Sequence, residues 1–162
     1  MAKVFMMCGR ICSGKSTYAK RLRDEYRAAV LSVDEITLAL FDGDTGDKHD
    51  LYVERAEEYL YRKSLELIEC GINVVLDWGF WQRYERDYAR GFYGSRGIEY
   101  EFVYIDIDRG EWTRRLQKRN KDVLEGRLSA YYVDEGLMQK FEDMFQPPQE
   151  DEKITVISQE NI

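Results

Sequence analysis

The stretch Gly9-Arg10-Ile11-Cys12-Ser13-Gly14-Lys15-Ser16 decides the fold of this chain. Its order of Gly, four residues, Gly, Lys and Ser is the spacing of a phosphate-binding loop. The mostly apolar run 3–8 before it is typical of a strand that is buried on both faces of a parallel sheet. Apolar residues after it recur at helical spacing, which predicts a helix over residues 16–27. Strand, loop and helix therefore follow one another in the order that such a loop requires.

The chemistry of this loop is the capture of a nucleotide's phosphates. Its glycines let the backbone curl with amide hydrogens pointing inward, and the amino terminus of the following helix adds a partial positive charge. We expect Lys15 to reach the β- and γ-phosphates, and the Ser16 hydroxyl to hold the magnesium ion that bridges them. A chance Gly-rich turn is the alternative, but the strand-to-helix setting favours the phosphate loop. The candidate nucleotide-binding residues here are Gly9, Cys12, Ser13, Gly14, Lys15, Ser16 and Thr17.

The rest of the chain alternates strands with helices, without an internal repeat or a linker. Further strands are predicted at residues 29–33, 73–76, 100–107 and 154–157, and further helices at 53–68, 81–89, 111–120 and 134–145. This alternation predicts an α/β fold of three layers around a largely parallel sheet with right-handed crossovers. We expect residues 1–162 to form a single domain.

Composition excludes several classes of protein. A chain of 162 residues with 44% hydrophobic content is one domain with a real core. The 24 Lys and Arg against 31 Asp and Glu give a net charge of −7, which argues against binding long nucleic acids. No apolar run reaches the roughly 18 residues of a membrane span, and the amino terminus lacks the pattern of an export signal, so the expected compartment is the cytoplasm. The three Cys are expected to be reduced thiols.

Two aspartates follow predicted strands, where a ligand crevice forms in an open α/β sheet. Asp34 follows the second strand, and we assign it as the general base that accepts a proton from the acceptor hydroxyl. Asp77 follows the third strand, and we assign it as a second acid that helps to hold the magnesium water shell or the acceptor. The two roles could be exchanged. The structural alternative is that each residue only terminates its strand in a turn or cap.

The positive charges that a phosphoryl transfer needs lie in the segment 109–127. It holds seven Lys or Arg against three Asp or Glu, a local charge of +4. Arg115 and Arg119 are four residues apart and therefore share a helix face. Followed by the predicted flexible segment 120–129, they indicate a small helical lid at about 110–130 that closes over the triphosphate and excludes water. A solvated helix face that pairs with acids is the alternative.

The motifs separate three classes of nucleotide-dependent protein. A guanine-specific switch would carry Asn-Lys-x-Asp, but the nearest stretch, Asn120-Lys121-Asp122-Val123, has its acid in the wrong place. A motor ATPase usually ends a strand with Asp-Glu, whereas Asp77 is followed by Trp78. A kinase needs one carboxylate for the acceptor and positive charges over the phosphoryl group, and both are present.

With these motifs the sequence resembles the P-loop kinases of the adenylate-kinase-like class. Within that class it is most similar to the small bacterial kinases grouped with the kinase domain of polynucleotide kinase, the zeta toxins and chloramphenicol phosphotransferase. The resemblance covers nearly the whole chain and rests on residues 9–17, 32–35, 74–81, 115–120 and 145–148 with Asp151 and Glu152. It implies a P-loop NTPase fold with a five-stranded parallel sheet in the order 2-3-1-4-5. It also implies ATP with Mg²⁺, Asp34 as the base and Arg119 as a lid arginine.

Some positions depart from this family or stay open. The polynucleotide kinase and zeta branches commonly carry an Arg three residues after the base, where this chain has Thr37. Phe145 and Pro147 are candidates to pack on adenine. An aromatic cluster, namely Trp78, Phe80, Trp81 and Tyr84, either lines an acceptor pocket or belongs to the core. Arg83 and Arg86 either bind an anionic acceptor or lie on an exposed helix face.

The sequence as a whole predicts an ATP-dependent kinase that phosphorylates a hydroxyl of a small molecule. The predicted catalytic residues are Lys15, Asp34, Asp77, Arg115 and Arg119, and Ser16 and Asp77 are the predicted metal-binding residues. The alternatives are a zeta-like toxin that acts on a nucleotide sugar, and a nucleotide-dependent regulatory protein with weak ATPase activity. The acceptor and the oligomeric state stay open at this point.

Overall fold

The computed structural model describes residues 1–42, 44–158 and 162. Its centre is a sheet of five strands that pair in parallel, in the order β2-β3-β1-β4-β5. The strands are β1 (Lys3–Cys8), β2 (Ala29–Leu31), β3 (Val74–Leu76), β4 (Glu99–Asp106) and β5 (Thr155–Ser158). The predicted α/β class and the strand order 2-3-1-4-5 are confirmed.

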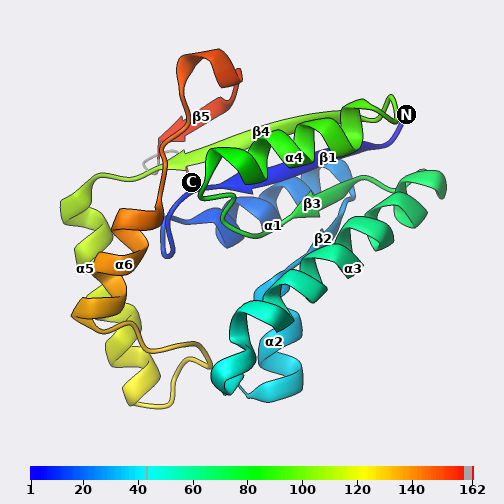
Figure 1. The fold of residues 1–162 in the computed structure, drawn as a ribbon. Coiled ribbons are helices and arrows are strands. Elements are labelled where there is room, and N and C mark those ends of the chain that lie inside the picture. Colours follow the sequence, from blue (N-terminus) through cyan, green and yellow to red (C-terminus); the bar gives the residue numbers. More distant parts are fainter. Residues whose placement is uncertain (43, 159–161) are drawn as a thin grey trace.

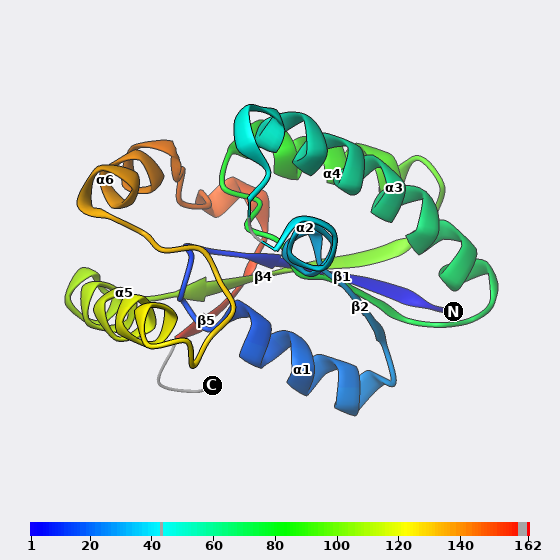
Figure 2. The ribbon, with the colours of Figure 1, turned by 90° about the horizontal axis from the view of Figure 1, so that it is seen from below.

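Helices cover both faces of the sheet, which makes the three predicted layers. Helix α1 lies on one face, and α3 and α4 lie on the other (Figure 2). Helices α5 and α6 stand side by side beyond one end of the sheet (Figure 1). The helices are α1 (Lys15–Tyr26), α2 (Val33–Phe41), α3 (His49–Glu69), α4 (Arg83–Gly94), α5 (Arg109–Leu124) and α6 (Glu135–Met144), with 3-10 turns η1 (Gly46–Lys48) and η2 (Glu150–Glu152). Within the described ranges, no helix combines the length and apolar character of a membrane span.

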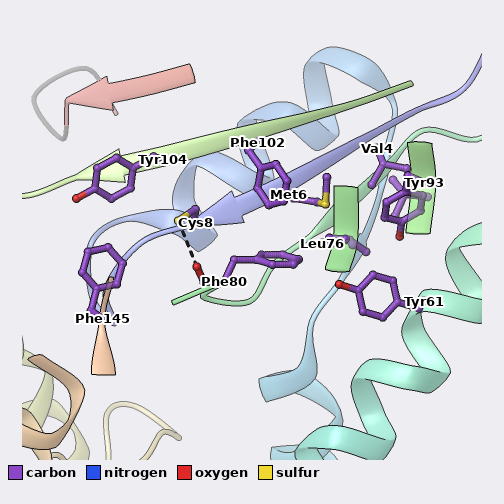
Figure 3. Packing of buried hydrophobic residues seen from close by; sticks show 12 residues of the cluster. Val4, Met6, Cys8, Tyr61, Leu76, Phe80, Tyr93, Phe102, Tyr104 and Phe145 are labelled. Atoms are coloured by element: carbon purple, nitrogen blue, oxygen red, sulfur yellow. Dashed lines mark hydrogen bonds between the residues drawn. The ribbon is translucent and has the colours of Figure 1, made fainter. Parts of the chain in front are cut away.

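The core follows from the apolar character of the central strand. Every residue from Val4 to Cys8 is buried. Val4, Met6 and Cys8 face the side covered by α3 and α4, where Phe80 and Phe102 lie beside them (Figure 3). Alternate side chains of β1 pack against α1 on the opposite face. A strand with two buried faces requires apolar residues at successive positions, which is the pattern of this run.

The second strand ends earlier than predicted, and this changes the setting of Asp34. β2 stops at Leu31, and Ser32 caps helix α2. The Ser32 hydroxyl accepts a hydrogen bond from the backbone N–H of Glu35 at 3.3 Å, which satisfies one of the free amides of the first helical turn. Asp34 therefore lies in the first turn of α2, and the prediction that it ends the second strand is wrong.

The two helices on either side of β4 are also longer than predicted. α4 starts at Arg83 after a capping box between Gln82 and Glu85, and it runs through the glycines at 91 and 94. The helix continues there because Tyr93 is buried in the core, and this packing outweighs the poor helix propensity of Gly. α5 is capped by Asp108 and continues to Leu124, so the first half of the predicted flexible segment 120–129 is helical.

Candidate active site

The predicted phosphate-binding loop joins the end of β1 to the start of α1. Gly9 and Gly14 have φ angles of +147° and +105°, a region that disfavours residues with a side chain. A Cβ atom on Gly9 would lie 3.0 Å from the backbone oxygen of Ile105 and 3.1 Å from the Ser13 hydroxyl. Cys12 also has a positive φ, of +59°. The tight path of this loop therefore explains both glycines of the motif.

The β3–α4 connection is hydrogen-bonded to the start of the phosphate-binding loop. Trp81 Nε1 donates a hydrogen bond of 2.9 Å to the carbonyl oxygen of Gly9, and the Gly9 N–H donates to Gly79 at 3.0 Å. The thiol of Cys8 donates to the carbonyl of Phe80 at 3.5 Å. The Phe80 side chain belongs to the core, and Trp81 contacts the loop through its hydrogen bond to Gly9. The β3–α4 connection thus fixes the position of Gly9 through these hydrogen bonds.

The connection is in turn fixed by a buried arginine. Phe80 has a φ of +47°, which is uncommon for a bulky residue. Arg86 donates to the carbonyls of Phe80 at 3.0 Å and Trp81 at 3.3 Å, and it pairs with Glu152 through bonds of 2.7 and 2.8 Å. Both charged side chains are completely buried. Burial alone would raise the pKa of Glu152, but hydrogen bonds from Arg86, Gln149 and Arg90 outweigh it and hold this pKa at about 2.

These ion pairs decide one question that the sequence left open. Arg86 is fully buried, and Arg83 pairs with Asp151 through a bidentate contact at 3.1 and 2.5 Å. Arg83 and Arg86 are therefore both engaged with the segment before β5. Arg86 does not lie on an exposed helix face, because its side chain is completely buried. The Arg83 side chain is partly exposed and lines a cavity, so its contact with an anionic acceptor stays a prediction.

The four polar residues that the sequence assigned to chemistry lie together at the loop. Burial lowers the pKa of Lys15, and the charges of Asp77 and Asp34 act against this shift. Burial raises the pKa of Asp77, whereas a hydrogen bond with Ser16 and the charge of Lys15 lower it. The Lys15 ammonium donates to the carbonyl of Arg10 at 2.6 Å. Lys15, Ser16, Asp77 and Asp34 therefore influence one another electrostatically, and their catalytic and metal-binding roles stay predictions.

Ser16 and Asp77 fit the predicted magnesium site. Both side chains offer oxygen atoms, the ligands that Mg²⁺ prefers, and they meet at the amino terminus of α1. Over residues 1–42, 44–158 and 162 no three His, Cys, Asp or Glu side chains cluster as a metal cage. A Mg²⁺ ion that arrives with a nucleotide takes most ligands from phosphate and water, so one hydroxyl and one carboxylate are a suitable protein contribution.

Helix α5 brings its two predicted arginines against the loop. Arg115 Nη1 donates to the carbonyl of Ser13 at 3.3 Å, and Arg119 Nη1 contacts the Cys12 sulfur at 3.5 Å. Trp112, one turn earlier, donates from Nε1 to the carbonyl of Ile11 at 2.7 Å. The guanidinium groups therefore border the phosphate-binding loop, where positive charge would stabilise a triphosphate.

The predicted adenine-binding pair is arranged less simply. Phe145 is only 6% exposed. The Tyr104 ring stacks on the Phe145 ring with 6.0 Å between the ring centroids, and the Arg10 guanidinium lies 4.7 Å from the centroid of the Phe145 ring. Pro147 is exposed, and it lines a cavity of about 370 Å³ together with Phe145 and Arg83. The Phe145 ring is nevertheless almost fully covered in this conformation. Contact of these two residues with adenine stays a prediction. Thr17, also predicted to bind the nucleotide, is exposed in the first turn of α1.

Sequence reasoning missed the residues that hold the loop in place. Trp81 and Trp112 each use their indole N–H on a carbonyl of the loop. A buried or partly buried Trp usually finds a partner for this N–H, so the residue type was a signal. The identity of the partner was not predictable, because these contacts join segments 72 and 101 residues apart.

Several solved structures with a similar fold are named as kinases. A sugar kinase from Janibacter sp. HTCC2649 has a TM-score of 0.67 and 17% identity, and the match covers 100% of this chain and 87% of that one. The APS kinase CysC of Mycobacterium tuberculosis, solved with AMPPNP and APS, has a TM-score of 0.67 and 19% identity over 97% and 88%. A gluconokinase from Sinorhizobium meliloti 1021 has a TM-score of 0.62 and 14% identity over 96% and 82%.

At these identities the likeness shows the fold, which is the P-loop NTPase fold of the sheet order described above. A search of curated proteins finds no match to the sequence. A family model described as an AAA domain matches residues 4–148, which is nearly the whole chain and includes the loop, Asp34, Asp77, Arg115 and Arg119. The chain therefore belongs to the AAA_33 family of AAA domains.

Proposed function

We propose that this protein is an ATP-dependent kinase that transfers the γ-phosphoryl group to a hydroxyl of a small molecule. The observation that carries the proposal is the grouping of Lys15, Asp77 and Asp34 at one phosphate-binding loop, with Arg115 and Arg119 on its border. The names of two structural neighbours, a sugar kinase and a gluconokinase, support a small-molecule acceptor.

Nucleotide binding uses the loop and the positive charges around it. The backbone amides of residues 9–16 and the start of α1 receive the phosphates. The Lys15 ammonium, which contacts the Arg10 carbonyl in this structure, turns to the β- and γ-phosphates. Arg115 and Arg119 approach from α5 and balance the charge that develops on the phosphoryl group. Mg²⁺, held by Ser16 and Asp77, would neutralise the phosphate oxygens.

Transfer then needs one proton acceptor. Asp34 takes the proton of the acceptor hydroxyl as its oxygen forms a bond to the γ-phosphorus, and the bond from that phosphorus to the β–γ bridging oxygen breaks. The products are a phosphorylated alcohol and ADP. Asp34 is exposed in the first turn of α2 and can meet an acceptor without rearrangement of the core. Asp77 is half-buried beside Ser16, a position that suits the metal better than the acceptor.

The test is a metabolite panel incubated with ATP, Mg²⁺ and the protein, with mass spectrometry of the phosphorylated products. We expect ADP release to rise many-fold with one class of hydroxyl compound. Asp34→Ala should abolish this stimulated rate, and Glu35→Ala, an exposed carboxylate in the same turn, is the matched control. Lys15→Ala should abolish turnover altogether. Unstimulated ATP turnover that is indifferent to Asp34→Ala would favour a regulatory nucleotide-binding protein.

A further inference from the structure

The connection from α5 to α6 touches the helix that carries Asp34. The segment between α5 and α6 runs from the end of α5 toward α2 (Figures 1 and 2). There the hydroxyl of Tyr131 lies 3.1 Å from the Thr37 hydroxyl, and its ring meets the His49 ring edge-on at 5.9 Å. The connection from α5 to α6 therefore contacts the start of α3 as well as α2.

Hydrogen-bond accounting shows that Tyr131 is the donor in this contact. The Thr37 hydroxyl has one proton, and it faces the carbonyls of Val33 at 3.3 Å and Asp34 at 3.2 Å. A hydroxyl that donates to a backbone carbonyl can still accept, so the Tyr131 O–H points at Thr37. Thr37 is only 1% exposed, and water does not compete at this oxygen. The contact therefore stabilises the helical turn that presents Asp34.

The same connection is hydrogen-bonded to α5 at Val133, two residues after Tyr131. The Asn120 side chain pairs with both backbone groups of Val133: it donates to the carbonyl at 2.5 Å and accepts from the N–H at 2.9 Å. Val133 is buried against Trp112 and Leu116 of the same helix. Asn120 directly follows Arg119. A short run of contacts thus leads from the arginine-bearing helix to the turn of Asp34.

We infer that Tyr131 is a positioning residue that keeps Arg119 on α5 and Asp34 on α2 in one fixed relation. Its catalytic meaning rests on the proposed kinase function, but the contact itself is a property of the protein without nucleotide. Because Asn120 holds Val133 and Tyr131 contacts Thr37, the positions of α5 and α2 depend on each other. Loss of the Tyr131 hydroxyl uncouples the two helices and leaves the phosphate-binding loop unchanged.

Amide hydrogen exchange, read by mass spectrometry on peptides from α2, tests the link directly. Without nucleotide, Tyr131→Phe and Thr37→Val should each speed exchange in residues 36–40 by about 3- to 10-fold, the effect of one lost shielded hydrogen bond. The double variant should exchange no faster than the faster single variant, because both changes remove the same contact. Tyr132→Phe, which changes a neighbouring half-exposed tyrosine, is the control and should match the wild type.

Two further measurements separate positioning from a structural role. The calorimetric Kd for Mg²⁺ with AMP-PNP and the melting temperature should stay near the wild-type values in Tyr131→Phe. In Tyr131→Phe the basal rate of phosphate release from saturating ATP should fall by about 3- to 10-fold, because loss of the same hydrogen bond displaces the first turn of α2, which carries Asp34. Unchanged α2 exchange in Tyr131→Phe, or strictly additive single effects, would overturn the inference. If AMP-PNP does not slow exchange over residues 9–16 of the wild type, the kinase proposal fails, and the nucleotide-free comparison still decides the link.

Discussion

Trp81 and Gly9, 72 residues apart in the chain, are joined by a hydrogen bond of 2.9 Å from the indole N–H to the first carbonyl of the phosphate-binding loop. The carbonyl of Gly9 would otherwise be a buried acceptor without a partner, since Gly9 itself is buried. The bond therefore makes the shape of the loop depend on the β3–α4 connection.

Trp81→Phe should weaken nucleotide binding without unfolding the protein. The ring can still pack against Phe141, but the loop loses a fixed point worth about 1–2 kcal/mol. We expect the Kd for Mg²⁺ with ATP, measured by calorimetry, to rise by about 5- to 30-fold. Trp78→Phe is the matched control, because Trp78 packs on Tyr61 and Phe80. An equal loss of affinity in both variants would show that bulk packing, and not this bond, holds the loop.

Arg86 and Glu152 should be costly to separate. Glu152→Gln leaves a fully buried guanidinium with a weakened partner, and Arg86→Met leaves a buried carboxylate. Each change should lower the free energy of unfolding by about 3–5 kcal/mol in urea titrations. The exposed pair Arg83 and Asp151 is the comparison, and Arg83→Ala should cost about 0–1 kcal/mol. Equal costs for the buried and the exposed pair would contradict this account.

Glu57 should make stability depend on pH. Burial, with added repulsion from Glu85 and Glu54, raises the pKa of Glu57 to about 7 from 4.5. The folded state therefore binds the Glu57 proton more tightly than the unfolded state does. This contribution is complete below the unfolded pKa and is lost as pH rises toward 7, at most about 3 kcal/mol. Glu57→Gln mimics the protonated form, so its melting temperature should exceed that of the wild type at pH 8 and match it at pH 4. A gain of equal size at both pH values would exclude ionisation as the cause.

Two glycines with opposite surroundings should respond oppositely to alanine. Gly9→Ala places a Cβ 3.0 Å from the Ile105 carbonyl at a φ of +147°, so the loop must distort and ATP binding should be lost. Gly91 lies inside α4 with no neighbouring atom in the way. Gly91→Ala should therefore raise stability by about 0.5–1 kcal/mol without changing the Kd for ATP. Calorimetry and urea titration of both variants check this pair.

The sequence was most informative where a local pattern controls structure. The turn between β1 and α1 and the apolar β1 run are each set by residues within a few positions, and both were predicted. The strand order was implied only by the family resemblance. The helical setting of Asp34 was missed, although Ser32 with Glu35 three residues later is a capping signal that the sequence contains.

Tertiary contacts account for the remaining errors. Arg86 was read as a candidate for an anion or for solvent, because an arginine is rarely buried without a partner. Its partner Glu152 is 66 residues away, and no local spacing indicates that pairing. The same holds for Tyr131, whose contact with Thr37 spans 94 residues.

The orientation of Arg115 has a consequence for the entropic cost of the proposed triphosphate binding. Its Nε donates to Glu111 at 2.8 Å while its Nη1 points at the Ser13 carbonyl. Hydrogen bonds from Arg114 and Arg115 lower the pKa of Glu111 to about 2, so this anchor stays charged across the physiological range. The guanidinium is thus aimed before its ligand arrives, and little rotational entropy remains to be lost on association.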